Sequence, residues 1–233
     1  MLYAVAEGAA VGIAFGLSDE EIAAGIPEGD ILPLTLADAK AVTQKSAMRA
    51  DRDGDNHYDL LSALQKSIRG SDPDAAVYWL GKMLTAGEDP RFIARRLVIS
   101  AREDIGNADP RGISVAVAAM QACEFVGMPE CAINLAQATT YLASAPKSNA
   151  SCMAISEAMA DIESGAVQPV PEHLKNKHVK AIGSETVTEY KYPHNFANHY
   201  VKQEYMGVPK SYYRRTQEGY EATIQKRLSA LRA

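Results

Sequence analysis

Apolar residues recur at helical spacing through the middle of the chain, from about residue 57 to residue 163. After Pro73, six apolar residues share one arc of a wheel drawn at about 100° per residue: Ala76, Val77, Trp79, Leu80, Met83 and Leu84. Segments 113–126 and 131–143 are apolar on nearly all sides, which is typical of buried helices. These patterns predict a compact, all-α body over residues 57–163.

Glycine followed shortly by Asp-Pro divides this body into helices. The strings are GSDP from Gly70, GEDP from Gly87 and GNADP from Gly106. In each, we expect the glycine to take the left-handed conformation that ends a helix, the aspartate to cap the next helix, and the proline to occupy its first turn. Prolines at positions 73, 90, 110, 129 and 146 continue this rhythm at intervals of 17, 20, 19 and 17 residues. Such short connections predict antiparallel neighbouring helices.

The flanking regions divide the rest of the chain. Residues 1–50 are predicted to form a smaller helical unit, with one or two helices in residues 1–30 and one capped helix in 34–50. A polar linker over residues 51–56 joins this unit to a core domain over 57–165. Residues 166–233 are predicted to be an extended C-terminal segment of the same domain, with short helical turns and a last helix from about 217 to 231.

Composition is that of an ordinary globular protein, with 47% hydrophobic and 23% charged residues. The apolar N-terminus lacks a basic region and reads as a buried helix rather than a signal peptide. No apolar run is long enough to cross a bilayer, so no membrane contact is expected. The three cysteines are expected to be reduced core residues. A cytoplasmic location follows as the expectation.

The net charge of −5 conceals an asymmetry. Residues 171–233 carry eleven Lys and Arg against six Asp and Glu, and seven of the eleven tyrosines follow residue 189. A basic, tyrosine-rich tail is compatible with nucleic-acid contact. It is equally compatible with a tail that packs on the body or on another subunit through its tyrosines, and both interpretations stay open here.

Catalytic and metal-binding patterns are absent from the sequence. It contains no phosphate-binding P-loop, no dinucleotide-binding glycine string, no nucleophile elbow and no zinc-protease motif. The acidic stretch 51–62 lacks the glycine and the glutamate that a calcium loop requires at its sixth and twelfth positions. The five histidines do not show zinc-site spacing. We predict no catalytic residue, no metal site and no cofactor within this chain.

Two groups of cations are candidates for binding anions. Arg91, Arg95 and Arg102 fall within about 40° of one another on a helical wheel. Three cations on one helix face can bind phosphate or acids of another subunit, or can simply be solvated. Lys147 and Asn149 stand in the string APKSNA at a predicted helix start, where anions are favoured but where a simple cap is also expected.

Several ordered blocks of the sequence resemble the C-terminal part of the replication-associated recombination protein A family. They include HYDLLSALQKSIRGSDPDAAVYWLGKML, GEDPRFIARRLV, REDIGNADPR, APKSNA, PVPEHLKN and YPHNF, and the resemblance runs from about residue 34 to residue 220. This family, also called maintenance of genome stability protein A, comprises bacterial AAA+ ATPases related to the Werner-helicase-interacting ATPases of eukaryotes. The order of the blocks makes the resemblance specific.

The resemblance implies a clamp-loader-like protein in which an AAA+ module binds ATP and Mg²⁺, a helical lid follows, and a collar-like helical domain forms a tetramer. Residues 1–50 then correspond to the end of the lid, and residues 57–233 to the tetramerisation domain. Because Walker A, Walker B and sensor motifs are missing, we expect the chain to be part of a longer protein. The implied process is replication, recombination and repair at stalled forks, in the bacterial nucleoid.

The implied partners are further copies in a homotetramer, DNA through the full-length protein, and single-strand-binding protein. Candidate contacts between copies are Trp79, Met83, Tyr205, Tyr212 and Tyr213. Candidates for DNA or anion binding are Arg91, Arg95, Arg102, Lys147, Asn149, Arg214 and Arg215. The alternative function is an autonomous DNA-binding helical module, which the basic tail and the arginine stripe favour.

Overall fold

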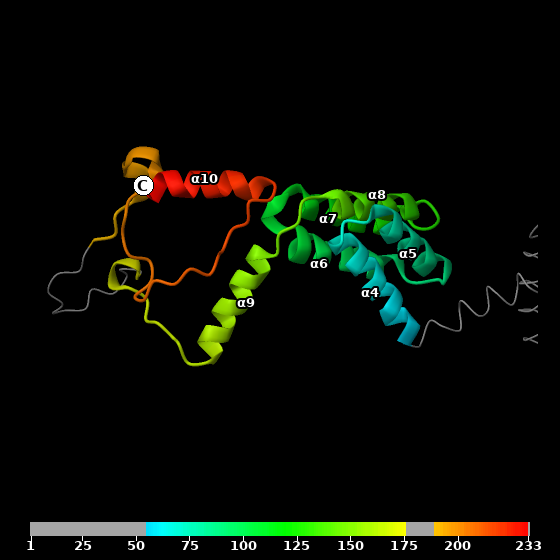
Figure 1. The fold of residues 1–233 in the computed structure, drawn as a ribbon, viewed down its shortest axis with the longest axis horizontal. Coiled ribbons are helices and arrows are strands. Elements are labelled where there is room, and N and C mark those ends of the chain that lie inside the picture. Colours follow the sequence, from blue (N-terminus) through cyan, green and yellow to red (C-terminus); the bar gives the residue numbers. More distant parts are fainter. Residues whose placement is uncertain (1–54, 176–188, 233) are drawn as a thin grey trace, which may run out of the picture.

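A computed structural model describes residues 55–175 and 189–232, and these residues are helical or irregular with no β-strand among them. The prediction of an all-α fold is confirmed. The helices predicted over residues 1–30 and 34–50 lie outside the described residues. Five helices form a bundle, and two more project from one end of it (Figure 1). None of the described helices is long and apolar enough to span a bilayer.

The bundle consists of α4 (Asp55–Arg69), α5 (Pro73–Thr85), α6 (Pro90–Ser100), α7 (Arg111–Val126) and α8 (Cys131–Ser144). Helix α4 packs on α5, α6 packs on α7, and α7 packs on α8, while α8 also contacts α4, α5 and α6. The core is made of fully buried aliphatic side chains from every helix, among them Leu64, Leu80, Ile93 and Leu135. The predicted linker 51–56 is wrong at its end, because α4 begins at Asp55 and its buried residues belong to this core.

The first two Asp-Pro strings begin helices as predicted, whereas in the third Pro110 precedes α7 and is not part of its first turn. The carboxylate of Asp72 accepts a hydrogen bond from the backbone N–H of Ala75 at 2.9 Å, and Asp89 accepts one from Arg91 at 2.9 Å. Gly87 takes the predicted positive φ of 85° at the end of α5. The prediction is wrong at Gly70, since Ser71 takes the positive φ of 60° there.

Helices α7 and α8 are less buried than their apolar sequences predict. Phe125 is 89% exposed and Ile133 is 73% exposed, and both lie at the turn that joins the two helices. Val77, which we placed on the buried arc of α5, is 36% exposed. The expectation of burial on nearly all sides is therefore wrong, because the bundle has one core and these outward positions face away from it.

Helix α6 continues into a wide turn, η2 (Ala101–Ile105), in which hydrogen bonds span five residues, and then into a short helical turn, η3 (Gly106–Ala108). A turn whose hydrogen bonds join residues five apart rotates the side chains that follow it relative to a regular α-helix, in which they join residues four apart. Arg102 lies in this wide turn, so the predicted arginine stripe does not continue on one regular helix.

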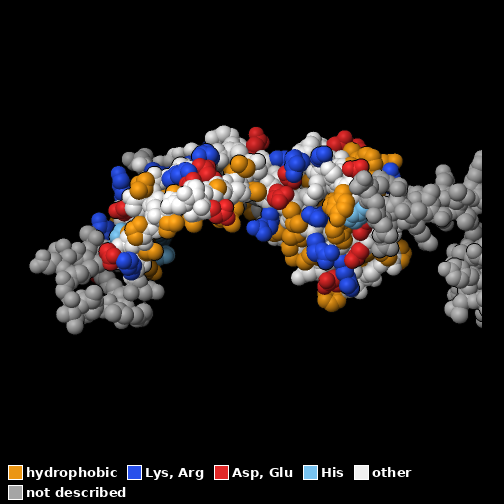
Figure 2. Space-filling view, turned by 90° about the horizontal axis from the view of Figure 1, so that it is seen from below, with side chains coloured by type: hydrophobic (Ala, Val, Ile, Leu, Met, Phe, Trp, Pro, Cys, Tyr) orange, Lys and Arg blue, Asp and Glu red, His pale blue; other side chains and the backbone are white. Residues whose placement is uncertain are grey.

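Helices α9 (Ala150–Glu163) and α10 (Tyr220–Arg232) both leave the bundle near η3 and diverge from each other (Figure 1). Between them the chain is mostly extended, with short turns at Glu172–Leu174, Pro193–Asn195 and Ala197–His199. The predictions of an extended segment with short turns, and of a last helix near 217–231, are confirmed for the described residues. In the space-filling view the molecule forms an arch whose concave side carries many hydrophobic side chains (Figure 2).

Candidate interaction surface

A junction of three segments holds the projecting helices on the bundle. It comprises η3, the loop 145–149 before α9, and residues 213–221 at the start of α10. A β-carbon on Gly106 would stand 2.8 Å from the carbonyl oxygen of Ser148, and one on Gly219 would stand 2.1 Å from the carbonyl oxygen of Ala108. Only glycine permits backbones to approach this closely. The GNADP and APKSNA strings are therefore parts of one structural joint.

The fully buried carboxylate of Glu221 is the centre of this junction. It accepts hydrogen bonds from the backbone N–H and the hydroxyl of Thr216, both at 2.7 Å, and from the hydroxyl of Tyr213 at 2.9 Å. Burial raises the pKa of Glu221, but these hydrogen bonds outweigh it and leave the pKa below its ordinary value. Asn107 donates to the Tyr213 hydroxyl at 3.0 Å and to Ser151 at 3.1 Å, which ties α9 to the same network.

Helix α9 presents an apolar seam that is largely open to solvent. Ile155, Met159 and Ile162 are 58%, 53% and 58% exposed. With half-buried Cys152 they follow one another at spacings of three, four and three residues, so they fall on one face of the helix. This is the spacing by which two helices pack side chains into each other along a shared seam.

An apolar groove continues the seam onto the bundle. It has a volume of about 670 Å³ and is bounded by α6 and η2, by the start of α7, and by α9. Its apolar walls include Val98, Ile99 and Ile113 on the bundle and Cys152 and Ile155 on α9. The seam and the groove therefore form one surface, which we call the α9 surface.

The other face of α9 is acidic and is occupied by the tail. Lys210 lies 2.6 Å from Asp161 and 3.1 Å from Glu157, and Arg214 lies 3.0 Å from Glu157. The Tyr212 hydroxyl donates to Asp161 at 2.8 Å. The hydrogen bond from Lys210 lowers the pKa of both carboxyls. Tail residues 210–214 thus hold α9 by its polar face and leave its apolar face open.

The arginine candidates keep their charges at the surface. Arg91, Arg95 and Arg102 are exposed, and no described carboxylate lies within ion-pair distance of them. Arg102 lines the groove beside α9. Their role in binding DNA or another anion stays a prediction.

The candidates in the APKSNA string have structural partners. Lys147 turns inward, and its ammonium donates to the carbonyl oxygens of Ala143 at 2.9 Å and Ala145 at 2.6 Å. Burial lowers the pKa of Lys147. Asn149 is the N-cap residue of α9, but its exposed side chain accepts no capping hydrogen bond, and the hydroxyl of Ser148 instead accepts from the N–H of Ala150 at 3.2 Å. Lys147 therefore stabilises the end of α8, and its role in binding an anion stays a prediction.

The residues proposed to join copies fall in different environments. Met83 is 1% exposed and belongs to the core, so its side chain is not on a surface that another copy reaches. Trp79 is half-buried against the core. The hydroxyls of Tyr212 and Tyr213 donate hydrogen bonds to Asp161 and Glu221 of the same chain. Arg214 forms an ion pair with Glu157 of α9. Tyr205 is 53% exposed and accepts a hydrogen bond from Gln203 at 2.9 Å.

Sequence reasoning missed the α9 seam, the buried Glu221 and a second exposed apolar patch. The patch lies at the turn between α7 and α8 and consists of Phe125, Val126, Met128 and Ile133. The three-four-three spacing on α9 was a usable signal, whereas Glu221 gave none. Among the described residues no group of three or more His, Cys, Asp or Glu side chains could hold a metal ion.

Comparison with known families gives two matches. The family described as "MgsA AAA+ ATPase C terminal" matches residues 70–232, and the family described as "AAA C-terminal domain" matches residues 15–69. The two matches meet at the exposed turn between α4 and α5, two helices whose buried side chains share one core.

Curated relatives agree with these matches. An uncharacterized AAA domain-containing protein of Mycobacterium tuberculosis is 51% identical over 81% of this chain and 43% of its own length. The replication-associated recombination protein A of Bacillus subtilis is 45% identical over 83% of this chain and 47% of its own length. The ATPase WRNIP1 of Dictyostelium discoideum is 40% identical over 76% of this chain and 20% of its own length. The chain thus spans less than half the length of these relatives.

Proposed function

This chain belongs to the family of MgsA AAA+ ATPase C-terminal domains, and we propose that it holds several copies of such an ATPase together through the α9 surface. The seam formed by Ile155, Met159 and Ile162 is the observation that carries the proposal. A monomer would leave these large side chains in water on a helix that stands apart from its own bundle. A second copy is the partner that an unpaired seam of heptad-like spacing fits.

Comparing the free energy gained by burying the seam with the free-energy cost of association shows how large the contact between copies must be. Full burial of a large aliphatic side chain stabilises by about 1.5–3 kcal/mol, and the three seam residues are already partly covered, so they contribute less than that each. Association costs at least about 4 kcal/mol in lost freedom of motion. The seam alone therefore barely offsets the cost of association. Burial of the adjoining groove, with Val98, Ile99 and Ile113, supplies the remainder in our proposal.

The tail favours binding between copies because it holds α9 in a fixed position before another copy binds. Lys210, Tyr212 and Arg214 hold the acidic face, and the junction fixes the start of the helix. A helix that is already ordered loses less conformational freedom on binding. We infer that the tail is a brace for the α9 surface, while Trp79 and Tyr205 remain secondary candidates for contacts between copies.

A tetramer needs either one head-to-tail surface or two separate self-complementary surfaces. The α7–α8 patch of Phe125, Val126, Met128 and Ile133 is a second apolar area distinct from the α9 surface. We infer a tetramer in which the α9 surface forms one contact and the α7–α8 patch forms the other.

The names of the relatives support a wider proposal for the whole protein. We infer an ATPase that acts in replication-associated recombination and repair, with ATP and Mg²⁺ bound by an AAA+ module outside this chain, and with DNA and single-strand-binding protein as partners. A location in the bacterial cytoplasm, with the nucleoid, accords with this role.

Two matched substitutions test the assembly proposal. Met159 on the seam and Met153 on another face of α9 are 53% and 56% exposed, and they lie about 120° apart around the helix. In sedimentation of the 233-residue chain at tens of micromolar, we expect a particle of about four times the 25.1 kDa chain mass. Met159→Glu should reduce that mass, and Met153→Glu should not. A monomeric wild-type chain, or equal behaviour of the two variants, would contradict the proposal.

A further inference from the structure

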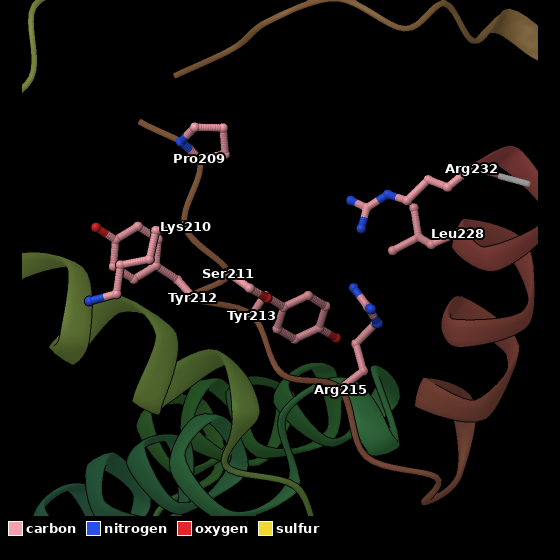
Figure 3. Close-up of a pocket in the computed structure, with 8 residues that line it drawn as sticks. All are labelled: Pro209, Lys210, Ser211, Tyr212, Tyr213, Arg215, Leu228 and Arg232. Carbon is pink, nitrogen blue, oxygen red and sulfur yellow. The ribbon is translucent and has the colours of Figure 1, made fainter. Parts of the chain in front are cut away.

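An open hollow lies between the extended segment 209–215 and helix α10, away from the α9 surface (Figure 3). Its volume is about 550 Å³. Its walls consist of one stretch of tail and one side of α10: Pro209, Lys210, Ser211, Tyr212, Tyr213, Arg215, Leu228 and Arg232. The hollow is thus built by two segments that the junction at Gly219 brings together.

Two guanidinium groups reach into this hollow from different segments. Figure 3 shows Arg215 extending from the tail and Arg232 from α10, with Leu228 between them. No described carboxylate lies within ion-pair distance of either group. Lys210, by contrast, is neutralised by Asp161 and Glu157. Two uncompensated guanidinium groups that converge on one space favour a phosphate or a carboxylate there.

Arg215 is held in position. Its Nε donates to the side-chain oxygen of Gln225 at 2.5 Å, and its guanidinium lies 5.8 Å from the centre of the Tyr213 ring. The remaining nitrogens of the guanidinium are left for a ligand, because a guanidinium has five N–H donors. A pre-positioned cation loses less freedom when it binds.

The apolar walls of the hollow are also rigid. The hydroxyl of Tyr213 is bonded to Asn107 and Glu221, so the orientation of its ring is fixed. Pro209 and Leu228 add further apolar surface. A fixed aromatic ring beside a guanidinium is the combination on which an unpaired base stacks.

The charge of the surroundings supports an anionic ligand. The described residues 209–232 contain six Lys and Arg and only two acidic residues, Glu218 and Glu221. Glu221 is buried and engaged by Thr216 and Tyr213, so its charge is directed away from the hollow. Cations, a rigid aromatic ring and open space therefore coincide in this hollow.

We propose that this hollow binds one nucleotide unit of a single-stranded nucleic acid, with Arg215 and Arg232 on the phosphate and the base against Tyr213 and Leu228. A duplex keeps its bases stacked and cannot present one to the ring. An acidic peptide would satisfy the two arginines but would leave the flat apolar wall unused. The site is separate from the contact between copies, and its test does not depend on the assembly proposal.

The test measures the anisotropy of labelled oligo(dT) mixed with the 233-residue chain over a range of salt concentrations. Arg215→Gln with Arg232→Gln removes the two proposed contacts. Lys226→Gln with Arg227→Gln is the matched control, since it removes equal charge from exposed residues of α10 outside the hollow. Circular dichroism checks that both variants fold.

We expect the first variant to bind about tenfold more weakly. Its salt dependence, as the slope of log affinity against log salt, should decrease by about 0.7, because the two arginines contact one phosphate. The control variant should lose less than about threefold in affinity for oligo(dT). Equal losses in the two variants, or no binding by the wild-type chain, would overturn the proposal. So would binding of duplex DNA or of an acidic peptide as tight as that of oligo(dT).

The same measurement on Met159→Glu separates this proposal from the assembly proposal. A monomeric Met159→Glu chain has the hollow intact, so the ratio of its affinity to that of its own Arg215→Gln and Arg232→Gln derivative should stay at about tenfold. Loss of that ratio in the monomer would show that the hollow does not bind the strand by itself.

Discussion

The backbone of Gly219 touches the backbone of Ala108, so that the first turn of α10 rests directly on the end of η3. A β-carbon on Gly219 would stand 2.1 Å from the carbonyl oxygen of Ala108 and 2.8 Å from Cγ of Pro146, and the residue has a φ of 53°. Neither neighbour is the free end of a flexible side chain. The docking of α10 on the bundle therefore depends on the absence of a side chain at one position.

Gly219→Ala should detach α10. The added methyl group forces the two backbones apart, and we expect a loss of about 3 kcal/mol in the stability of the docked helix. Hydrogen exchange of the α10 amides measures this. Gly165→Ala is the matched control, because Gly165 also has a positive φ, of 93°, but has open space around it. That change should cost only about 1 kcal/mol, and equal effects of the two would contradict the close contact.

Acid should release α10 through Glu221. The pKa of this carboxyl is below its ordinary value of 4.5 in the folded chain, so the folded state binds the proton less readily than the unfolded state. The stabilisation is therefore complete above about pH 4.5 and is lost as the pH falls through the lowered pKa. Hydrogen exchange of α10 between pH 6 and pH 3 should show the loss.

Glu221→Gln measures how much the carboxylate of Glu221 contributes to the docking of α10. The amide cannot accept from Thr216 and Tyr213 as the carboxylate does, so docking should weaken by about 2 kcal/mol near neutral pH. Its acid sensitivity should also decrease. Asp109, whose pKa is lowered to about 2 mainly by Arg111, remains in the variant and accounts for residual acid sensitivity. A variant as acid-sensitive as the wild type would show that another group controls the docking.

Asp161→Asn should loosen the tail from α9. The substitution removes the carboxylate that pairs with Lys210 and accepts from Tyr212. Trypsin should then cut faster after Lys210 and Arg214, and high salt should speed the same cuts in the wild type because it screens exposed pairs. Glu163→Gln changes an exposed carboxyl at the end of the same helix and should leave the cuts unaltered. Unchanged cutting in Asp161→Asn would mean that the ion pairs do not hold the tail.

Cys152 should report assembly chemically. It is half-buried on the α9 surface, whereas Cys123 and Cys131 are buried in the core. Burial raises the pKa of Cys123 to about 11, which keeps this thiol unreactive near neutral pH. A thiol reagent should label one cysteine per chain quickly in Met159→Glu and slowly in the wild type. Fast labelling of the assembled wild type would place Cys152 outside the contact between copies.

The helix starts could be predicted from sequence because their causes are local. Proline and a capping aspartate act within one turn, and Asp72 and Asp89 cap their helices as expected. The end of α4 was less predictable, since either Gly70 or Ser71 can supply the left-handed residue. The choice follows from how the turn meets the next helix.

The interaction surface was harder to predict for two reasons. Periodicity shows that Ile155, Met159 and Ile162 share a face, but it does not tell whether the same chain covers that face. Buried Glu221 joins segments that lie far apart in sequence, for example through Tyr213 to Asn107. Met83 shows the opposite error, because an apolar helical arc has the same pattern whether it faces its own core or another copy.

The position of α4 bears on how this protein can be divided for experiments. Leu64 and Ile68 of α4 are fully buried against helices that follow the turn at residue 70, where the two family matches meet. A recombinant fragment that starts at Gly70 would lack helix α4. The hydrophobic groove that α4 fills in the bundle would then be exposed to solvent. Such a piece should aggregate during expression, whereas a piece that starts upstream of α4 should be well behaved.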